Sequence, residues 1–221
     1  MVIAIDGPSG SGKTSTAKLL AEKLGFYYCD SGSLYRAITY HLIGAGTDLD
    51  SSFAILNELK GVEIEYDVVS NSIILNNRNV TQFLRTDRVT SKVSKVSSIK
   101  IVRDFLISVQ RILGVDENII LDGRDIGTTV FPNAEYKFYI DANVEVRARR
   151  RFEESKAEGS HRDYENILKM MKERDSYDQG REHSPLAIAK DAICIDTTDL
   201  NLDEQVDKII NIIKKSKEQE K

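Results

Sequence analysis

The sequence predicts an α/β protein, a three-layer αβα sandwich around a five-stranded parallel sheet. Five short apolar segments have strand character, at residues 2–5, 26–29, 118–122, 136–140 and 192–195, and helical periodicity fills much of the chain between them. Strands separated by helices form parallel sheets covered on both faces. A glycine-rich loop directly after the first strand indicates that ligands bind at the carboxyl ends of the strands.

That loop matches the phosphate-binding P-loop pattern G-x-x-x-x-G-K-[ST] over residues 7–14. Ala17 and Leu20 follow at helical spacing, so the motif lies between a strand and a helix, which a simple glycine-rich turn does not require. In such a loop Lys13 reaches the β- and γ-phosphates and the Thr14 hydroxyl is a ligand for Mg²⁺. We therefore expect ATP to bind at Gly7, Pro8, Ser9, Gly10, Ser11, Gly12, Lys13, Thr14 and Ser15.

Between the second and third strands the pattern changes twice. Helices are expected over residues 34–42 and 51–59. Apolar and charged residues then alternate and two polar turns follow, which predicts an antiparallel meander over residues 62–80. Helical spacing returns between Val89 and Leu113, so the meander is an insert in the αβ pattern.

The second half of the chain is rich in arginine. Eight of the 14 arginines lie from Arg124 to Arg181, many of them in two predicted helices over residues 143–158 and 163–180. Because guanidinium groups match phosphate oxygens, this clustering favours a site for a phosphorylated ligand. A solvated, salt-bridged helix face explains part of it. A final helix follows the fifth strand.

Composition limits the classes of function. With 221 residues, 41% of them hydrophobic, the chain is expected to form a single domain over residues 1–221. The net charge of −4 argues against a nucleic-acid partner. The short apolar start is too brief for a signal peptide, and no apolar run is long enough to cross a membrane. We expect a cytoplasmic monomer with no membrane partner.

Cysteine and histidine offer no metal site or nucleophile. Cys29 and Cys194 are isolated, which is typical of reduced cysteines in the cytosol. The three histidines, His41, His161 and His183, are far apart, so neither a zinc site nor a histidine-based triad is expected.

Carboxylates and arginines gather where the predicted strands end. Asp122 closes an apolar strand and is the best candidate for an acid beside Mg²⁺, through a water molecule, although a turn cap is the alternative. Residues 30–36 open a helix whose free N–H groups, with Arg36, could hold a second anion. Arg124 and Asp125 offer a donor fork beside an acceptor, or else an internal salt bridge.

Together these segments resemble the cytidylate (CMP) kinases of the bacterial type, almost end to end. The P-loop is common to many families, whereas the segments at residues 30–36 and 122–132 are much more specific. The resemblance implies a lobe that binds the nucleoside monophosphate at about residues 31–115, including the 62–80 insert, and an arginine-rich lid at about residues 147–165. Further matches are Val102-Arg103, Gln110-Arg111, Arg147-Ala148, Arg150-Arg151, Glu173-Arg-Asp175, Asp178, Arg181 and Pro185-Leu186.

The resemblance also implies roles for individual residues. CMP would contact Ser31, Tyr35, Arg36, Ser94, Arg103, Arg124, Asp125, Arg174, Asp178 and Arg181. Transfer from ATP to CMP or dCMP would be assisted by Lys13, Arg124, Arg150 and Arg151, with Mg²⁺ bound to Thr14.

The chemistry of these residues agrees with such a substrate. A carboxylate at Asp125 can accept a hydrogen bond from the cytosine N4 amino group, while Arg103 and Ser94 satisfy the ring acceptors. Uracil would place an acceptor against that carboxylate, so UMP should be a poorer substrate. Asp178 with Arg174 would hold the sugar, and further arginines the phosphate. The acceptor phosphate is largely ionised near neutral pH, so no general base is needed.

Three other functions use the same motifs. A different small-molecule kinase on this scaffold would share the P-loop and the arginines. A nucleotide-dependent switch would bind GTP, but the guanine-reading pattern Asn-Lys-x-Asp is absent from the sequence. An ATPase module of a larger assembly has no repeat or long coupling helix in its favour.

Overall fold

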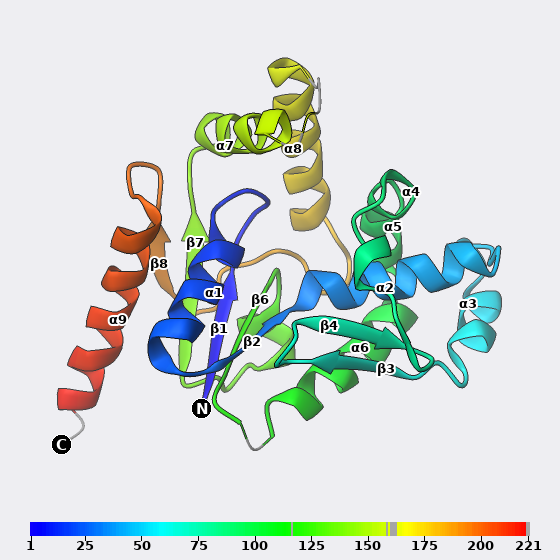
Figure 1. The fold of residues 1–221 in the computed structure, drawn as a ribbon, viewed down its shortest axis with the longest axis horizontal. Coiled ribbons are helices and arrows are strands. Elements are labelled where there is room, and N and C mark those ends of the chain that lie inside the picture. Colours follow the sequence, from blue (N-terminus) through cyan, green and yellow to red (C-terminus); the bar gives the residue numbers. More distant parts are fainter. Residues whose placement is uncertain (116, 158, 160–162, 220–221) are drawn as a thin grey trace.

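A parallel five-stranded sheet forms the centre of the computed structural model, which describes residues 1–115, 117–157, 159 and 163–219 (Figure 1). Every pair of neighbouring strands in this sheet is parallel, and the predicted strands are confirmed. The strand order places β1 in the middle of the sheet. The order is β2 (Tyr27–Asp30), β6 (Ile119–Gly123), β1 (Val2–Asp6), β7 (Tyr136–Asp141) and β8 (Ile193–Asp196).

Helices cover both faces of this sheet and complete the predicted three layers (Figure 1). On one face lie α1 (Lys13–Leu24) and α9 (Leu202–Gln219), and on the other α2 (Ser31–Gly44) and α6 (Lys100–Leu113). The two faces follow from the two-residue repeat of strands, because successive side chains of β1 point to opposite layers. The central strands are therefore largely apolar, apart from charged residues such as Asp6 and Asp122 near their carboxyl ends.

The P-loop connects β1 to α1 in a conformation that glycine permits. Gly12 stands at the start of α1 with a left-handed φ of 91°. A Cβ atom at Gly7 would lie 2.0 Å from the carbonyl oxygen of Ile140 in β7, so the loop passes directly against that strand. These two glycines let the backbone curve over the end of the sheet.

The predicted meander is confirmed as a second, antiparallel sheet of three short strands. Its strands are β3 (Ile64–Asp67), β4 (Ser72–Leu75) and β5 (Arg78–Asn79). Tyr66 of β3 is buried, and its hydroxyl accepts a hydrogen bond from the Asp30 amide at 3.2 Å. The insert thus contacts the point where α2 begins.

Short helices join the insert to the sheet. In chain order these are α3 (Ser52–Leu59), the turn η1 (Thr81–Phe83), α4 (Asp87–Thr90) and α5 (Val93–Ser98). The buried apolar side chains of α3 and α5 belong to the same cluster as residues of β1 and β6. The helices expected over this part of the sequence are confirmed.

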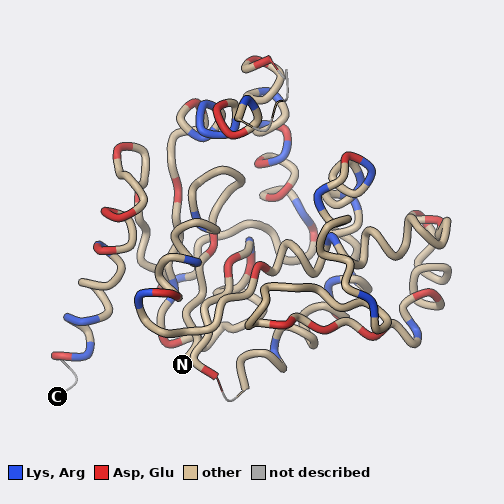
Figure 2. Tube along the Cα trace, in the orientation of Figure 1, with Lys and Arg blue, Asp and Glu red and all other residues tan. Residues whose placement is uncertain are grey.

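Two arginine-bearing helices, α7 (Val144–Ala157) and α8 (Tyr164–Gln179), form a pair at the edge where the strands end (Figure 1). They pack together through a small cluster that contains Ala148, Ile167 and Met171. Both basic and acidic residues lie along α7 (Figure 2). The helices expected over residues 143–158 and 163–180 are confirmed. Residues 158 and 160–162, which include His161 and fall within the predicted lid, lie outside the described residues.

None of the helices in the described ranges has the length and apolar character that a membrane crossing needs.

Burial on α6 gives a test of the packing. Leu106 is fully buried against the sheet, so Leu106→Ala should lower the free energy of unfolding by about 2–5 kcal/mol. Ile112 lies on the same helix but is 72% exposed, and Ile112→Ala should change it by less than about 0.5 kcal/mol. Urea unfolding of both variants measures the difference. Equal losses would contradict this packing.

Candidate active site

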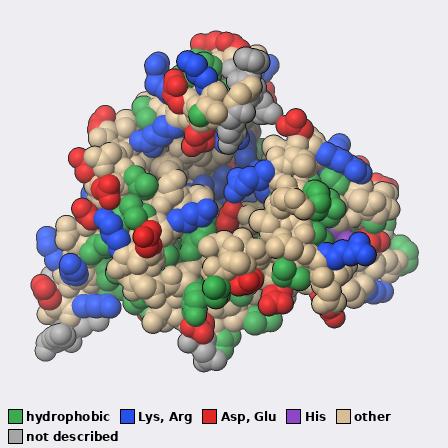
Figure 3. All heavy atoms as spheres, viewed as in Figure 1, with side chains coloured by type: hydrophobic (Ala, Val, Ile, Leu, Met, Phe, Trp, Pro, Cys, Tyr) green, Lys and Arg blue, Asp and Glu red, His purple; other side chains and the backbone are tan. Residues whose placement is uncertain are grey.

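A cavity of about 960 Å³ opens at the carboxyl ends of the central strands. The P-loop, the start of α2, the end of β6 and the helices α5, α7 and α8 contribute to its walls. Lys and Arg side chains gather in this hollow, between the α7–α8 pair and the rest of the molecule (Figure 3). Its size suits a site for more than one small ligand.

The P-loop end of the cavity carries a lysine and a hydroxyl. Lys13 is buried and its Nζ donates to the Pro8 carbonyl oxygen at 2.9 Å. Burial, together with the charge of Arg124, lowers the pKa of Lys13 to about 7. An anion bound in the loop would favour the charged lysine, because an opposite charge stabilises the ammonium form.

Thr14 and Asp122 form the candidate metal site. The Thr14 hydroxyl donates to one oxygen of Asp122 at 2.7 Å, and the Tyr28 hydroxyl donates to the other at 2.8 Å. Burial and the neighbouring Asp30 raise the pKa of Asp122. In the described ranges no three His, Cys, Asp or Glu side chains gather into a cation site. Hydroxyl and carboxylate oxygens nevertheless suit Mg²⁺, which keeps several waters and takes phosphate oxygens as ligands.

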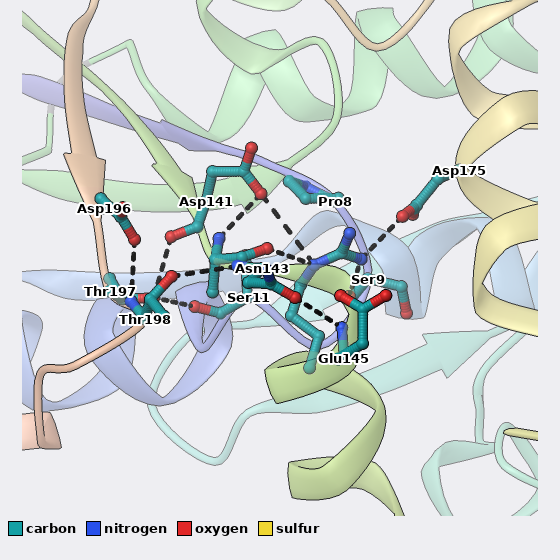
Figure 4. A network of polar contacts seen from close by, with 12 residues as sticks. Pro8, Ser9, Ser11, Asp141, Asn143, Glu145, Asp175, Asp196, Thr197 and Thr198 are labelled. Carbon is teal, nitrogen blue, oxygen red and sulfur yellow. Dashed lines mark hydrogen bonds and ion pairs between the residues drawn. The ribbon is translucent and has the colours of Figure 1, made fainter. Parts of the chain in front are cut away.

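A polar network holds the P-loop from outside (Figure 4). The Nη1 atom of Arg147 donates to the Ser9 carbonyl oxygen at 3.0 Å, and the Thr197 hydroxyl donates to that of Ser11 at 2.9 Å. Arg147 is buried and also pairs with Asp175 of α8 at 2.7 Å. The loop is therefore fixed in shape before any ligand binds.

This network changes the role expected for the arginines of α7. Arg147 is engaged with the P-loop backbone, not free above it. Arg150 donates to the Thr197 carbonyl oxygen at 2.6 Å, and Arg151 pairs with Glu154 at 3.1 Å. Arg150 and Arg151 both line the cavity, so they remain candidates for contact with phosphates.

A second group of positive charges surrounds Asp178 of α8. This aspartate is fully buried and accepts from Arg124 Nε at 2.9 Å, and it also pairs with Arg181. Burial alone would raise its pKa, but the two guanidinium groups outweigh burial and lower it. Arg36 is fixed by Thr90 at 2.9 Å. The cluster has several cations but one carboxylate, so positive charge is in excess and suits an anionic ligand.

Arg174 completes this cluster with an unused donor. Its Nε is buried and has no hydrogen-bond partner among the described residues. Burial and the charge of Arg124 lower the pKa of Arg174 to about 10. A buried guanidinium donor without a partner is unfavourable, and a phosphate or sugar oxygen would satisfy it.

A buried ion pair lies deeper in the cavity. Arg103 of α6 pairs with Asp125, and both side chains are almost inaccessible to solvent. Arg103 also donates to the Ser97 carbonyl oxygen at 2.8 Å and lies 5.2 Å from the centre of the Tyr35 ring. A flat aromatic face beside a fixed donor and acceptor could bind a nucleobase.

Asp6, at the end of β1, supports the segment that carries this pair. Its two carboxylate oxygens accept from the amides of Ile126 at 2.8 Å and Gly127 at 2.7 Å. Both amides belong to the turn η2 (Ile126–Val130). Burial raises the pKa of Asp6 to about 7, although these hydrogen bonds lower it.

Comparison with known proteins identifies the family. The cytidylate kinase family model matches residues 3–215. The cytidylate kinase of Fusobacterium nucleatum is 43% identical over 221 residues, which are 100% of this chain and 99% of that one. That of Ligilactobacillus salivarius is 45% identical over 96% of this chain and 95% of its own. The chain belongs to the cytidylate kinase family.

A solved structure resembles this fold. An uncharacterized protein from Eubacterium ventriosum superposes with a TM-score of 0.51 at 17% identity, over 97% of this chain and 98% of its own. The two proteins share the fold.

Most of the site residues predicted from the sequence lie in one place. The following line the cavity: Ser9, Gly10, Gly12, Lys13, Thr14, Ser15, Ser31, Tyr35, Arg36, Arg103, Asp122, Arg124, Asp125, Arg150, Arg151, Arg174, Asp178 and Arg181. Gly7, Pro8 and Ser11 belong to the same loop but do not line its open side.

Ser94 is the predicted CMP contact that the cavity does not include. It is half-buried on α5, whereas Ser97, three residues later on the same helix, lines the cavity and accepts from Arg181 at 3.0 Å. The sequence contained a signal for Ser97, because residues three apart, such as Ser94 and Ser97, lie on the same face of a helix. Arg85 and Gln205 also line the cavity and belong to no predicted motif.

The pKa of Asp6 predicts a pH-dependent stability. An acid whose pKa rises from 3.8 to about 7 on folding stabilises the protein less as pH increases through that interval. Wild type should therefore lose about 4 kcal/mol of unfolding free energy relative to Asp6→Asn between pH 4 and pH 8. Lys13, Asp125, Lys137 and Tyr139 surround this carboxyl and are unchanged in the variant.

Urea unfolding at several pH values measures this difference. Asp191→Asn is the matched control, because that exposed carboxyl has a lowered pKa and should follow wild type above about pH 5. A wild-type-minus-Asp6→Asn difference that stays constant with pH would show that Asp6 is ionised in both states.

Proposed function

We propose that this protein transfers the γ-phosphoryl group of ATP to CMP or dCMP, in the presence of Mg²⁺, giving ADP and CDP or dCDP. The observation that carries the proposal is a single cavity with two adjoining sets of cations, Lys13 on the P-loop and the arginines around Asp178. One set suits a triphosphate donor and the other a monophosphate acceptor.

ATP binds the P-loop in this proposal, at residues 7–15. The amides at the start of α1 and Lys13 contact the β- and γ-phosphates. Thr14 would hold Mg²⁺, with Asp122 through a water molecule, and the ion would neutralise charge on the phosphates. The contacts of Arg147 and Thr197 with the loop carbonyls support this role, because they leave the loop amides preformed.

CMP binds with its phosphate among Arg36, Arg124 and Arg181. Asp178 and Arg174 hold the sugar, while Ser31 and Tyr35 contribute to the wall of the pocket. The partnerless donor of Arg174 supports this placement.

The cytosine ring lies near the buried Arg103–Asp125 pair. Asp125 accepts from the N4 amino group, and Arg103 donates to the ring acceptors. Ser94 is the second donor to the ring that the sequence predicts, and Ser97 lies beside Arg103. Uracil turns that amino group into a second acceptor facing the carboxylate. A buried acceptor without a donor costs about 1–3 kcal/mol, so CMP is preferred over UMP.

No side chain needs to remove a proton during transfer. The attacking phosphate oxygen of CMP has a pKa of about 6 and is ionised at neutral pH. The residues around the cavity instead hold the two phosphates in line for transfer. The charge that spreads over the transferred group is stabilised by Lys13, Arg124, Arg150 and Arg151. Residues 147–165, in the α7–α8 pair, would act as a lid. Closure of this lid would exclude water from the transfer step.

The same proposal includes the protein's setting. We propose that the protein is a cytoplasmic monomer and that it has no nucleic-acid partner. The net charge of −4 supports the second of these points. Another small-molecule kinase or a nucleotide switch is not favoured, because the family relatives are cytidylate kinases over nearly the whole chain.

A coupled ADP-release assay across the common nucleoside monophosphates tests the function. CMP and dCMP should be the best acceptors, and UMP should have a kcat/KM lower by roughly 5- to 100-fold. Omission of Mg²⁺ should abolish turnover. Turnover of UMP or AMP at rates that match CMP would contradict the cytosine assignment.

Arg174→Met separates function from stability. The substitution removes a largely buried charge that Arg124 repels, and an Nε donor without a partner, so the melting temperature should stay equal or rise. Loss of a charged hydrogen bond to CMP should lower kcat/KM for CMP by roughly 10- to 100-fold. Lys169→Met, an exposed change on the same helix, is the control and should alter neither value. An unchanged KM for CMP would remove Arg174 from the acceptor site.

A further inference from the structure

Asp6 occupies the end of the central strand, next to both of its neighbours. It pairs in register with Gly123 of β6 and Tyr139 of β7, and it is 5% exposed. From this position its side chain reaches the chain segment that leaves β6. Each carboxylate oxygen accepts one hydrogen bond, one from the amide of Ile126 and the other from the amide of Gly127.

Those two amides directly follow Asp125. The carbonyl oxygen of Asp125 accepts from Thr129 at 2.9 Å and from Val130 at 3.1 Å, which closes the turn η2. The backbone after Asp125 is therefore held from two sides, by the turn and by the Asp6 carboxylate. The direction of the Asp125 side chain depends on this backbone.

The surrounding packing leaves the turn little freedom. A Cβ atom at Gly127 would lie 3.3 Å from an oxygen of Asp6 and 3.2 Å from the Lys137 side chain. The Lys137 ammonium is directed elsewhere and pairs with Asp191 at 2.7 Å. Across the described part of the chain, no Lys or Arg forms an ion pair with Asp6, so both of its oxygens serve the turn.

Such an arrangement is unfavourable for stability on its own. A buried carboxylate without a paired cation is costly even with two amide donors, and burial raises its pKa. An asparagine or an apolar residue would avoid that cost. The structure thus contains a feature that folding alone does not require.

We propose that Asp6 is a positioning residue for base selection: its carboxylate fixes the turn after Asp125 so that Asp125 is directed at the pyrimidine amino group. This inference rests on the proposed function, since it assigns Asp125 to the base. Asp6 touches no substrate in this role. The competing role, support of the neighbouring P-loop, would affect the ATP site instead.

A double-mutant cycle with Asp6→Asn and Asp125→Asn tests the proposal at pH 8. Asparagine matches aspartate in size, but at position 6 it sets an amide donor against a backbone N–H. The Asp6→Asn variant should lower the CMP-to-UMP ratio of kcat/KM by about tenfold, chiefly through the KM for CMP. The KM for ATP should stay within about twofold.

The two substitutions should not add. Asp125→Asn removes the selective acceptor itself, so Asp6→Asn in that background should leave the ratio within about twofold of the single variant. Asp191→Asn, which changes a nearby carboxylate of the Lys137 pair, is the control and should keep the wild-type ratio. Circular dichroism and melting temperature confirm that each variant is folded.

Gly127→Ala provides a second variant if Asp6→Asn does not fold. It keeps the carboxylate but displaces the turn by the contacts given above, and it should lower the same ratio. An unchanged ratio in the folded variant, additive effects, or an equal rise in the KM for ATP would overturn the proposal.

The wild-type arm tests the proposed function separately. If wild type does not prefer CMP, that function fails whatever the variants do. If wild type prefers CMP and the CMP-to-UMP ratio is unchanged in Asp6→Asn, only the positioning role fails.

Discussion

The rest of the site depends on the concentration of positive charge in one cavity. Lys13, Arg36, Arg124, Arg174 and Arg181 all line it. Burial, reinforced by the neighbouring cations, lowers the pKa of Lys13, Arg36, Arg174 and Arg181. Phosphate groups bound among these charges would offset both the repulsion and the loss of hydration. The same concentration of charge therefore favours phosphorylated ligands.

Buried carboxylates make this concentration possible and give it shape. Asp178 accepts from two arginines, Asp122 accepts from Thr14 and Tyr28, and Asp6 accepts only from backbone amides. Two of the three stand at the ends of central strands. Because parallel strands end at one edge of a sheet, residues more than 100 positions apart become neighbours there. The sheet therefore acts as the rigid base of the site.

Local signals in the sequence predicted most of this architecture. The apolar runs of β1 and β6, the glycine spacing of the P-loop and the alternation that begins at β3 each follow from short-range physical rules. Long-range contacts were beyond these rules. Arg147 was predicted among the lid arginines above the phosphates, but it is buried against the Ser9 carbonyl and Asp175. Likewise Ser97, and not Ser94, lines the cavity, because the orientation of α5 depends on its packing against α2 and α6.

By itself the sequence determined the class of protein, the phosphate-binding loop and the identity of nearly all charged residues around the cavity. Periodicity and motif spacing carry that information, since they reflect the backbone geometry of single elements. Only the tertiary structure decided which of those charges are paired, which remain partnerless and which carboxylate supports another. Those outcomes depend on burial and on distances of a few ångströms between distant segments, which no local pattern encodes.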